Sequence, residues 1–273
     1  MKPLIKSKYV EEFEQNGRLT SISVIDTHTH MGAIAGVSSP ICEIDDCLSY
    51  LEKKAVKQIW CTPDADYHCP MNFNSEIQSY MKNYPGKVMG YYAFNPNYEQ
   101  DYIDRIGMVL ENDSFIGVKV LPEYHGNKLD GKNYERCLEF ANQHNLIFLS
   151  HTWGKSPCNS PDNVAKILPK YRNLQFIMGH SAPGALDDAI KLVKEYDNVY
   201  LDICDIHRNS GIIEKMCREV GSEKVLFGTD MPWYDPSYAI GSVIYADITD
   251  SDRENIFYKN AERMIGAINK KRG

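Results

Sequence analysis

Short apolar runs alternate along the chain with longer segments in which apolar residues recur at helical spacing. The short runs are rich in β-branched and aromatic residues, which favour strands. Eight of them are expected to form strands, over residues 22–26, 56–61, 88–94, 115–120, 146–150, 174–178, 199–203 and 225–228. The intervening pattern predicts helices over residues 44–54, 75–84, 102–110, 134–144, 164–171, 187–196 and 212–220.

This alternation of strands and helices predicts the fold class. Repeated βαβ units with right-handed crossovers build a parallel sheet, and eight of them close an α/β fold of the (β/α)8 TIM barrel type. After the last strand, Ser251-Asp252-Arg253-Glu254 has the pattern of a capping box and predicts a final helix that reaches Ile265. The sequence shows no linker or low-complexity segment, so we expect one barrel domain over residues 1–273.

Charge and composition narrow the class of partner. The net charge of −7 and the lack of a basic block argue against nucleic acids and anionic membranes, and favour a small-molecule substrate. No apolar run approaches the roughly 18 residues of a membrane span, and the first residues do not resemble a signal peptide. We therefore expect a soluble, cytoplasmic protein whose eight cysteines are reduced thiols. Assembly into a homo-oligomer is left open.

Candidate metal ligands stand at or just beyond the ends of four predicted strands. They are His28 and His30 after Asp26 on the first strand, His151 after the fifth, His180 after the sixth and Asp230 after the eighth. Residues two apart in a strand share a face, so His28 and His30 can reach one ion, and barrel active sites lie at this end of the strands. Imidazole and carboxylate donors favour Zn²⁺, with Mn²⁺, Fe²⁺ and Co²⁺ as alternatives. Asp26 lies deeper and is expected to form hydrogen bonds rather than to bind the ion.

In this order, the residues resemble the amidohydrolase superfamily, in particular the amidohydrolase-related branch that includes aminocarboxymuconate semialdehyde decarboxylase. The segments that carry the resemblance are Asp26-Thr27-His28-Thr29-His30, Gly117-Val118-Lys119 with Pro122, Gly228-Thr229-Asp230, Asn260-Ala261 and the histidines after the fifth and sixth strands. The resemblance implies that His28, His30, His151 and Asp230 bind a divalent metal. It also implies catalytic roles for Asp230 and for His180, which would orient or deprotonate a metal-bound water. Ser181-Ala182-Pro183 departs from the glycine pair found after this histidine in many relatives.

Two cationic residues have alternative interpretations. In some relatives a lysine on the fourth strand is carboxylated and bridges two metals, whereas an ordinary Lys119 would bind an anionic group of the substrate. We favour the single-metal version. A desolvated Lys119 also permits Schiff-base chemistry, although the histidine set argues against it. Arg208 is a candidate partner for a substrate carboxylate.

Loops after the strands should shape the pocket, because barrel enzymes vary specificity there. The expected loops are 62–73, 122–133, 152–161, 205–209 and 231–238, and they carry several aromatic residues. The sequence predicts a metal-dependent hydrolase in which metal-bound hydroxide attacks an amide, a lactone or a related small carbonyl compound. The alternative enzyme is a nonoxidative decarboxylase of an unsaturated or aromatic carboxylate. The alternative that is not an enzyme is a metal-binding protein without catalytic activity.

Overall fold

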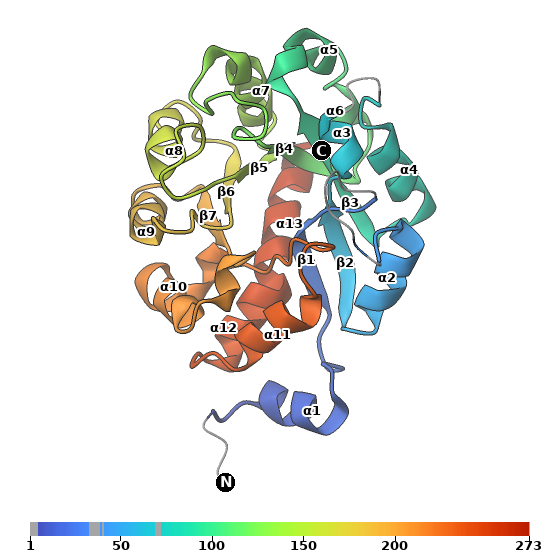
Figure 1. Cartoon of the computed structure of the whole chain (residues 1–273), viewed down its shortest axis with the longest axis vertical. Coiled ribbons are helices and arrows are strands. Elements are labelled where there is room, and N and C mark those ends of the chain that lie inside the picture. The colour runs from blue at the N-terminus through green and yellow to red at the C-terminus, as the bar shows by residue number, and fades with distance from the viewer. Residues whose placement is uncertain (1–4, 33–38, 40, 69–71, 273) are drawn as a thin grey trace.

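Eight parallel strands pair in chain order, β1 to β8, in the computed structural model of the protein, which describes residues 5–32, 39, 41–68 and 72–272. The strands are β1 (Val24–Thr29), β2 (Val56–Cys61), β3 (Val88–Phe94), β4 (Phe115–Val120), β5 (Ile147–His151), β6 (Gln175–Gly179), β7 (Val199–Asp202) and β8 (Val225–Leu226). Figure 1 shows them as an inner ring with helices around it. The predicted (β/α)8 TIM barrel is confirmed.

The barrel closes where the chain after β8 meets β1. The Thr27 N–H donates to the Phe227 carbonyl at 2.9 Å, and the Asp230 N–H donates to the His28 carbonyl at the same distance. Thr29 and Met231 form a further parallel bridge. This seam brings His28 and Asp230 together, although some 200 residues separate them along the chain.

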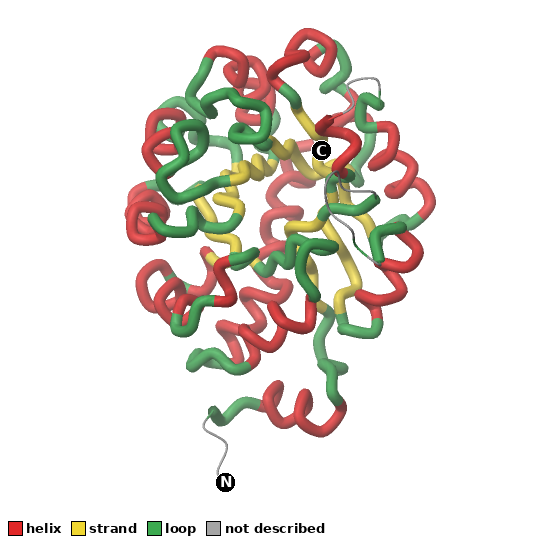
Figure 2. Tube along the Cα trace, in the orientation of Figure 1, coloured by secondary structure: helices red, strands yellow, loops and turns green. Residues whose placement is uncertain are grey.

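Most helices surround the strands, as the red segments show in Figure 2, while α13 is seen in the middle of the view. The helices are α1 (Lys8–Asn16), α2 (Ile44–Glu52), α3 (Asp64–His68), α4 (Ser75–Asn83), α5 (Glu99–Ile103), α6 (Met108–Glu111), α7 (Lys132–Gln143), α8 (Pro161–Ile167), α9 (Leu186–Glu195), α10 (Ile212–Val220), α11 (Pro236–Ile244), α12 (Asp250–Glu254) and α13 (Asn260–Arg272). Short 3-10 turns lie at Pro96–Tyr98, Ile206–Arg208 and Ser222–Lys224, and a π-helical segment at Asn255–Lys259 joins α12 to α13.

Three details of the helices differ from the sequence predictions. The helix expected over residues 102–110 is divided into α5 and α6, because the chain turns between them and Gly107, a weak helix former, precedes α6. The final helix is capped by Thr249 rather than Ser251: the Thr249 hydroxyl accepts from the Asp252 N–H, and the Asp252 carboxylate accepts from the Thr249 N–H. Helices α1, α3 and α11 were not predicted.

The strands and the inner faces of the helices bury one large apolar core. The seven cysteines that the structure describes are unbridged, in agreement with the expectation of reduced thiols, and Cys69 lies outside the described residues. Within the described part of the chain, none of the helices has both the length and the apolar character needed to cross a membrane.

Candidate active site

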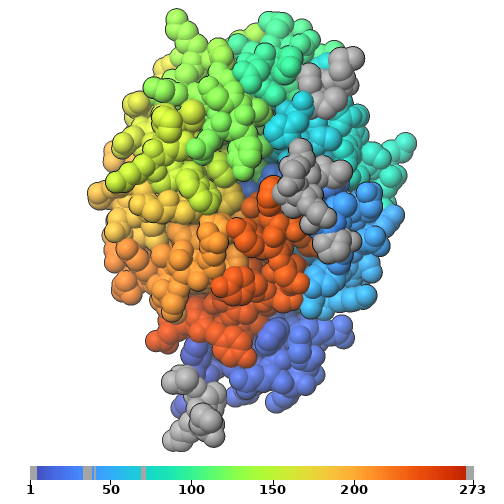
Figure 3. Space-filling model, in the orientation of Figure 1, coloured from blue at the N-terminus to red at the C-terminus, as the bar shows by residue number. Residues whose placement is uncertain are grey.

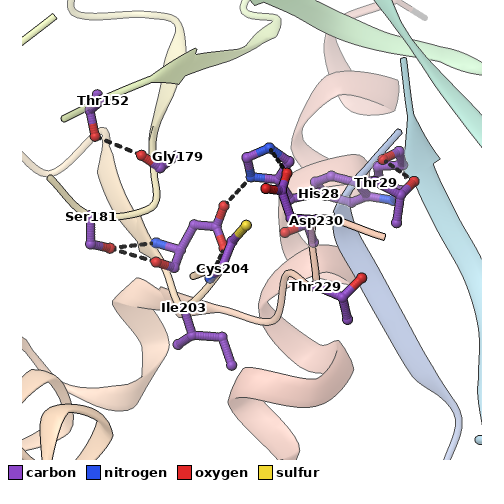
Figure 4. Close-up of polar contacts among 12 residues, drawn as sticks. His28, Thr29, Thr152, Gly179, Ser181, Ile203, Cys204, Thr229 and Asp230 are labelled. Carbon is purple, nitrogen blue, oxygen red and sulfur yellow. Dashed lines mark hydrogen bonds and ion pairs between the residues drawn. The ribbon is translucent and has the colours of Figure 1, made fainter. Parts of the chain in front are cut away.

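His28, His30 and Asp230 converge at the mouth of the barrel, where β1 meets the chain that follows β8. Asp230 Oδ1 lies 3.3 Å from His28 Nε2 and 3.4 Å from His30 Nε2. Figure 4 shows His28 and Asp230 facing each other at the ends of their segments. Burial opposes ionisation of Asp230, but the neighbouring His180, His30 and His28 hold its pKa well below the usual range. The carboxylate is therefore an anion beside several imidazoles.

A second carboxylate, that of Asp202 at the end of β7, fixes the His28 ring. Asp202 Oδ2 lies 2.5 Å from His28 Nδ1, and both side chains are buried. Burial raises the pKa of Asp202 to about 7, and the Cys204 N–H donates to its Oδ1 at 2.7 Å. Burial also holds the pKa of His28 well below its ordinary value, so the ring is neutral. With the ring proton on Nδ1 facing Asp202, the lone pair of Nε2 faces Asp230.

These donors fit a divalent metal. A lone pair on His28 Nε2 and a carboxylate oxygen repel each other at 3.3 Å unless a cation lies between them. In a tetrahedral site with bonds of roughly 2.0 to 2.1 Å, two ligand atoms lie about 3.3 Å apart, which matches this separation. Among the described residues, the buried His28 Nε2 has no hydrogen-bond partner. The residues His28, His30 and Asp230 therefore have the separations and the free electron pair that a metal ion requires.

His151 and His180 lie next to this group. The rings of His28 and His180 are 4.9 Å apart between centroids, and those of His180 and His151 are 4.6 Å apart. Both predicted residues therefore lie within the roughly 10 Å that a shared metal centre allows. His151 stacks on Trp153 with an interplanar angle of 6°. Burial lowers the pKa of His180 to about 3, so this ring is neutral.

The turn that holds His180 has an unusual backbone. His180, Ser181 and Ala182 have φ angles of 64°, 53° and 53°, in the left-handed region that non-glycine residues seldom occupy. The Ser181 hydroxyl donates to the Asp202 carbonyl at 2.6 Å and accepts from the Asp202 N–H at 3.0 Å. Residues 180–182 thus form a left-handed turn, and Ser181 ties it to β7.

Lys119 and Asp26 lie beneath the mouth. The Lys119 ammonium is buried, with Nζ 2.7 Å from His30 Nε2, and burial lowers its pKa to about 8. Asp26 accepts from the His28 N–H at 3.2 Å and from the Thr229 hydroxyl at 2.5 Å, which agrees with the expected hydrogen-bonding role. Burial raises the Asp26 pKa to about 8. Asp26 thereby ties β1 to the segment that carries Asp230.

A cavity of about 210 Å³ opens over these groups. In Figure 3 the same face is hollowed between green and orange parts of the chain, with a blue segment at the bottom. Its lining residues are His30, Asp64, His68, Leu121, Tyr124, His151, Trp153, His180, Asp205, Asp230, Trp233 and Tyr234. All five predicted loops contribute to this lining, together with residues at or near the strand ends, and residues 69–71 of the first loop lie outside the described residues. Aromatic rings from three of these loops give the cavity walls suited to a flat substrate.

Arg208 pairs with a wall residue of the cavity. Its guanidinium lies 3.1 Å from Asp205 Oδ1, and its side chain is 51% exposed. Asp205 also accepts from the Tyr234 hydroxyl at 2.5 Å. The carboxylate of Asp205 therefore holds both Arg208 and Tyr234, and the predicted contact between Arg208 and a substrate carboxylate stays a prediction.

The sequence interpretation missed two residues of the site, Asp202 and Cys204. One donor atom each from His28, His180, Cys204 and Asp230 lies within 4.8 Å of the others. Asp202 ends β7 in the same way that the predicted residues end their strands, so its position was a signal that could have identified it. Cys204 directly follows the strand predicted over residues 199–203, as His151 follows the strand predicted over 146–150, so the same signal was present for it; in the structure it lies two residues beyond the end of β7.

Comparison with known proteins identifies the family. The sequence matches the amidohydrolase family model over residues 64–267, most of the chain. The chain belongs to the amidohydrolase family. It is accordingly a metal-dependent enzyme of the amidohydrolase superfamily, and the resemblance noted in the sequence is confirmed. A comparison with curated proteins found no match.

Several solved structures share the fold of this amidohydrolase. The 2,6-dihydroxybenzoate decarboxylase from Rhizobium is 12% identical, with a TM-score of 0.74 over 89% of this chain and 98% of the other. The 5-carboxyvanillate decarboxylase from Sphingomonas paucimobilis is also 12% identical, with a TM-score of 0.72 over 90% and 99%. A dihydroxybenzoic acid decarboxylase from Polaromonas sp. JS666, with bound manganese and 2-nitroresorcinol, is 14% identical, with a TM-score of 0.73 over 89% and 97%.

Proposed function

We propose that this amidohydrolase is a nonoxidative decarboxylase of an aromatic or unsaturated carboxylate. The observation that carries the proposal is the aromatic wall of Tyr124, Trp153, Trp233 and Tyr234 above the histidine and aspartate donors. Such walls accept a flat ring and exclude water from it. Three structures with the same fold are named as decarboxylases of hydroxylated or methoxylated benzoates, which supports this reading over hydrolysis of an amide or lactone.

We propose that His28, His30, His151 and Asp230 hold a single divalent metal. When bound, that ion would supply a positive charge that orients a substrate carboxylate and withdraws electrons from it. Lys119 would remain an ordinary amine, and its 2.7 Å contact with His30 Nε2 would give way to the ion, because that nitrogen has a single lone pair. Zn²⁺ suits this set of nitrogen and oxygen donors, and Mn²⁺, which a related structure contains, is the alternative.

Residues of the chain would then transfer the proton that the reaction needs. Decarboxylation breaks the carbon–carbon bond to the carboxylate, releases CO2 and leaves the electron pair on the ring carbon, which must take up a proton. His180 lines the cavity together with Asp230, so these two groups are placed beside that carbon to relay a proton from solvent. Trp153 and Tyr124 flank His151 and hold the substrate plane beside these groups.

The test measures CO2 and the fate of the proton. Metal-loaded protein is incubated in D2O with a panel of hydroxybenzoates and, separately, with lactones and amides. We expect CO2 and the decarboxylated ring in equal amounts, with one deuterium at the vacated carbon. Asp230→Asn should abolish turnover, whereas Asp188→Asn on the exposed face of α9 should not. Consumption of a lactone or amide with uptake of water, and no CO2 from any carboxylate, would contradict the proposal in favour of hydrolysis.

A further inference from the structure

Cys204 places a sulfur atom among the candidate metal donors. The residue is completely buried, and its Sγ belongs to the group of donor atoms from His28, His180 and Asp230 that all lie within 4.8 Å of one another. Figure 4 shows Cys204 beside His28 and Asp230. A zinc–thiolate bond of about 2.3 Å and a zinc–nitrogen bond of about 2.0 Å put the two ligand atoms about 3.5 Å apart in a tetrahedral site. The separations observed need to shorten by no more than about 1.3 Å to reach this value.

The position of the thiol is fixed by the groups that also fix His28. The Cys204 N–H donates to Asp202 Oδ1 at 2.7 Å, while Oδ2 of the same carboxylate contacts His28 Nδ1. The Ser181 hydroxyl, in the neighbouring turn, forms hydrogen bonds with both the N–H and the carbonyl of Asp202. One carboxylate thus holds the Cys204 backbone and the His28 ring in a common arrangement, as the outer groups of a metal site do.

Two further atoms point to a ligand at this place. His28 Nε2 and His180 Nδ1 are buried and lack a hydrogen-bond partner within the described ranges. Their side chains belong to residues that are 1% and 4% exposed. Buried polar atoms without partners are rare and costly, and a metal ion bound by His28 Nε2 would satisfy that atom.

We propose that Cys204 binds the catalytic metal as a thiolate, in addition to His28 and Asp230, and that it makes the site selective for Zn²⁺ over Mn²⁺. Binding breaks the S–H bond, forms a sulfur–metal bond and releases the proton to solvent, with no change of oxidation state. Thiolate is a soft ligand that Zn²⁺ and Co²⁺ accept and that Mn²⁺, which prefers oxygen, binds poorly. The inference rests on the proposed metal-dependent function and departs from the manganese in a structure of similar fold.

Cobalt spectroscopy tests the bond directly. The metal-free protein is loaded with Co²⁺, and its near-ultraviolet spectrum is compared with those of Cys204→Ala, Cys204→Ser and the buried control Cys137→Ala on α7. We expect a thiolate-to-cobalt charge-transfer band in the wild type and in Cys137→Ala, and its loss in both Cys204 variants. A cobalt-loaded wild type without the band, or Cys204 variants that keep it, would overturn the inference while the metal site stands. Failure of the wild type to bind Co²⁺, Zn²⁺ or Mn²⁺ would instead contradict the proposed function.

Two measurements complete the test. X-ray absorption of the zinc-loaded wild type should show one sulfur neighbour at about 2.3 Å, a result that does not depend on whether a variant folds. With Zn²⁺ and Mn²⁺ supplied together, loss of the thiolate should lower the preference for zinc roughly tenfold or more in Cys204→Ala. A zinc ion with only nitrogen and oxygen neighbours, or an unchanged preference for Zn²⁺ over Mn²⁺ in Cys204→Ala, would overturn the inference.

Discussion

Asp202 Oδ2 and His28 Nδ1 lie 2.5 Å apart in the buried mouth of the barrel. The contact joins the end of β7 to the end of β1 and sets which nitrogen of His28 faces Asp230. A metal-binding histidine commonly depends on such a partner, which fixes both the tautomer and the orientation of the ring.

Replacing Asp202 by asparagine should therefore weaken metal binding without removing a metal ligand. An amide in place of the carboxylate stabilises the ring proton on Nδ1 less well, and outer residues of this type typically change metal affinity by about 10- to 100-fold. The affinity is measured by competition with a chelator. Asp197→Asn, outside the site, should retain the wild-type affinity, and an unchanged affinity in Asp202→Asn would refute the orienting role.

Gly228 should tolerate no side chain, because the Asp202 and His28 side chains approach its Cα closely. A Cβ on Gly228 would lie 2.9 Å from the Cβ of His28 and closer still to Asp202 Oδ1. We expect Gly228→Ala to lose about 1 to 3 kcal/mol of unfolding free energy, as overpacked cores do, and to bind metal less tightly. Gly241→Ala in α11 is the control: a Cβ there meets no described atom within 4 Å, and stability should stay the same or rise. Urea unfolding of both variants gives the comparison.

His180→Asn should separate a proton-transfer residue from a metal ligand. If His180 moves a proton, metal content stays near that of the wild type while kcat falls by about 10²- to 10⁴-fold. Metal content and turnover are measured on the same preparation. Loss of metal together with activity would make His180 a ligand, and unchanged activity would remove it from the mechanism.

The link between α1 and α12 predicts a pH-dependent contribution to stability. Glu254 accepts from Lys259, the Tyr9 hydroxyl and Lys8, and these hydrogen bonds lower its pKa to about 2. A depressed folded pKa stabilises the protein above the unfolded value, roughly 4.3 for glutamate, and this contribution is lost as the pH falls toward 2. Glu254→Gln should therefore cost about 1 kcal/mol near pH 7 and progressively less in acid.

Urea unfolding between pH 7 and pH 3 checks this expectation. The exposed Glu262 on α13 supplies a control, because Glu262→Gln should follow the wild type at every pH. A deficit for Glu254→Gln that stays constant or grows as the pH falls would contradict the proposed link.

The sequence predicted the barrel well because periodicity reports directly on which residues are buried. The bounds of β2, β3 and β4 agree with the prediction: β3 and β4 are nearly continuous apolar runs, and β2 ends in the three buried apolar residues 59–61. Helix α1 was missed, and its contacts lie with Asp250 and Glu254, far away in sequence. Its local pattern is as amphipathic as that of α7, which was predicted, so the sequence carried a signal that the prediction did not use.

Site residues could be predicted where they end a strand, and less well where tertiary contacts determine their position. His28, His30, His151, His180 and Asp230 follow from strand ends, which all meet at one mouth. The ion pair of Arg208 with Asp205 could not be predicted from the sequence. The two side chains meet because of a short turn, in which Asp205 has a positive φ of 57°. The position of Cys204 among the donor atoms also depends on a tertiary contact, the hydrogen bond from its N–H to the Asp202 carboxylate.

Elemental analysis of purified protein tests the central claim, a single metal held at the barrel mouth, most directly. The account predicts close to one divalent metal per chain, its loss in His28→Ala and Asp230→Ala, and its retention in His144→Ala at the end of α7. A metal-free preparation with full activity would contradict the site, and two metals per chain would contradict the single-metal centre in favour of a carboxylated Lys119 bridge.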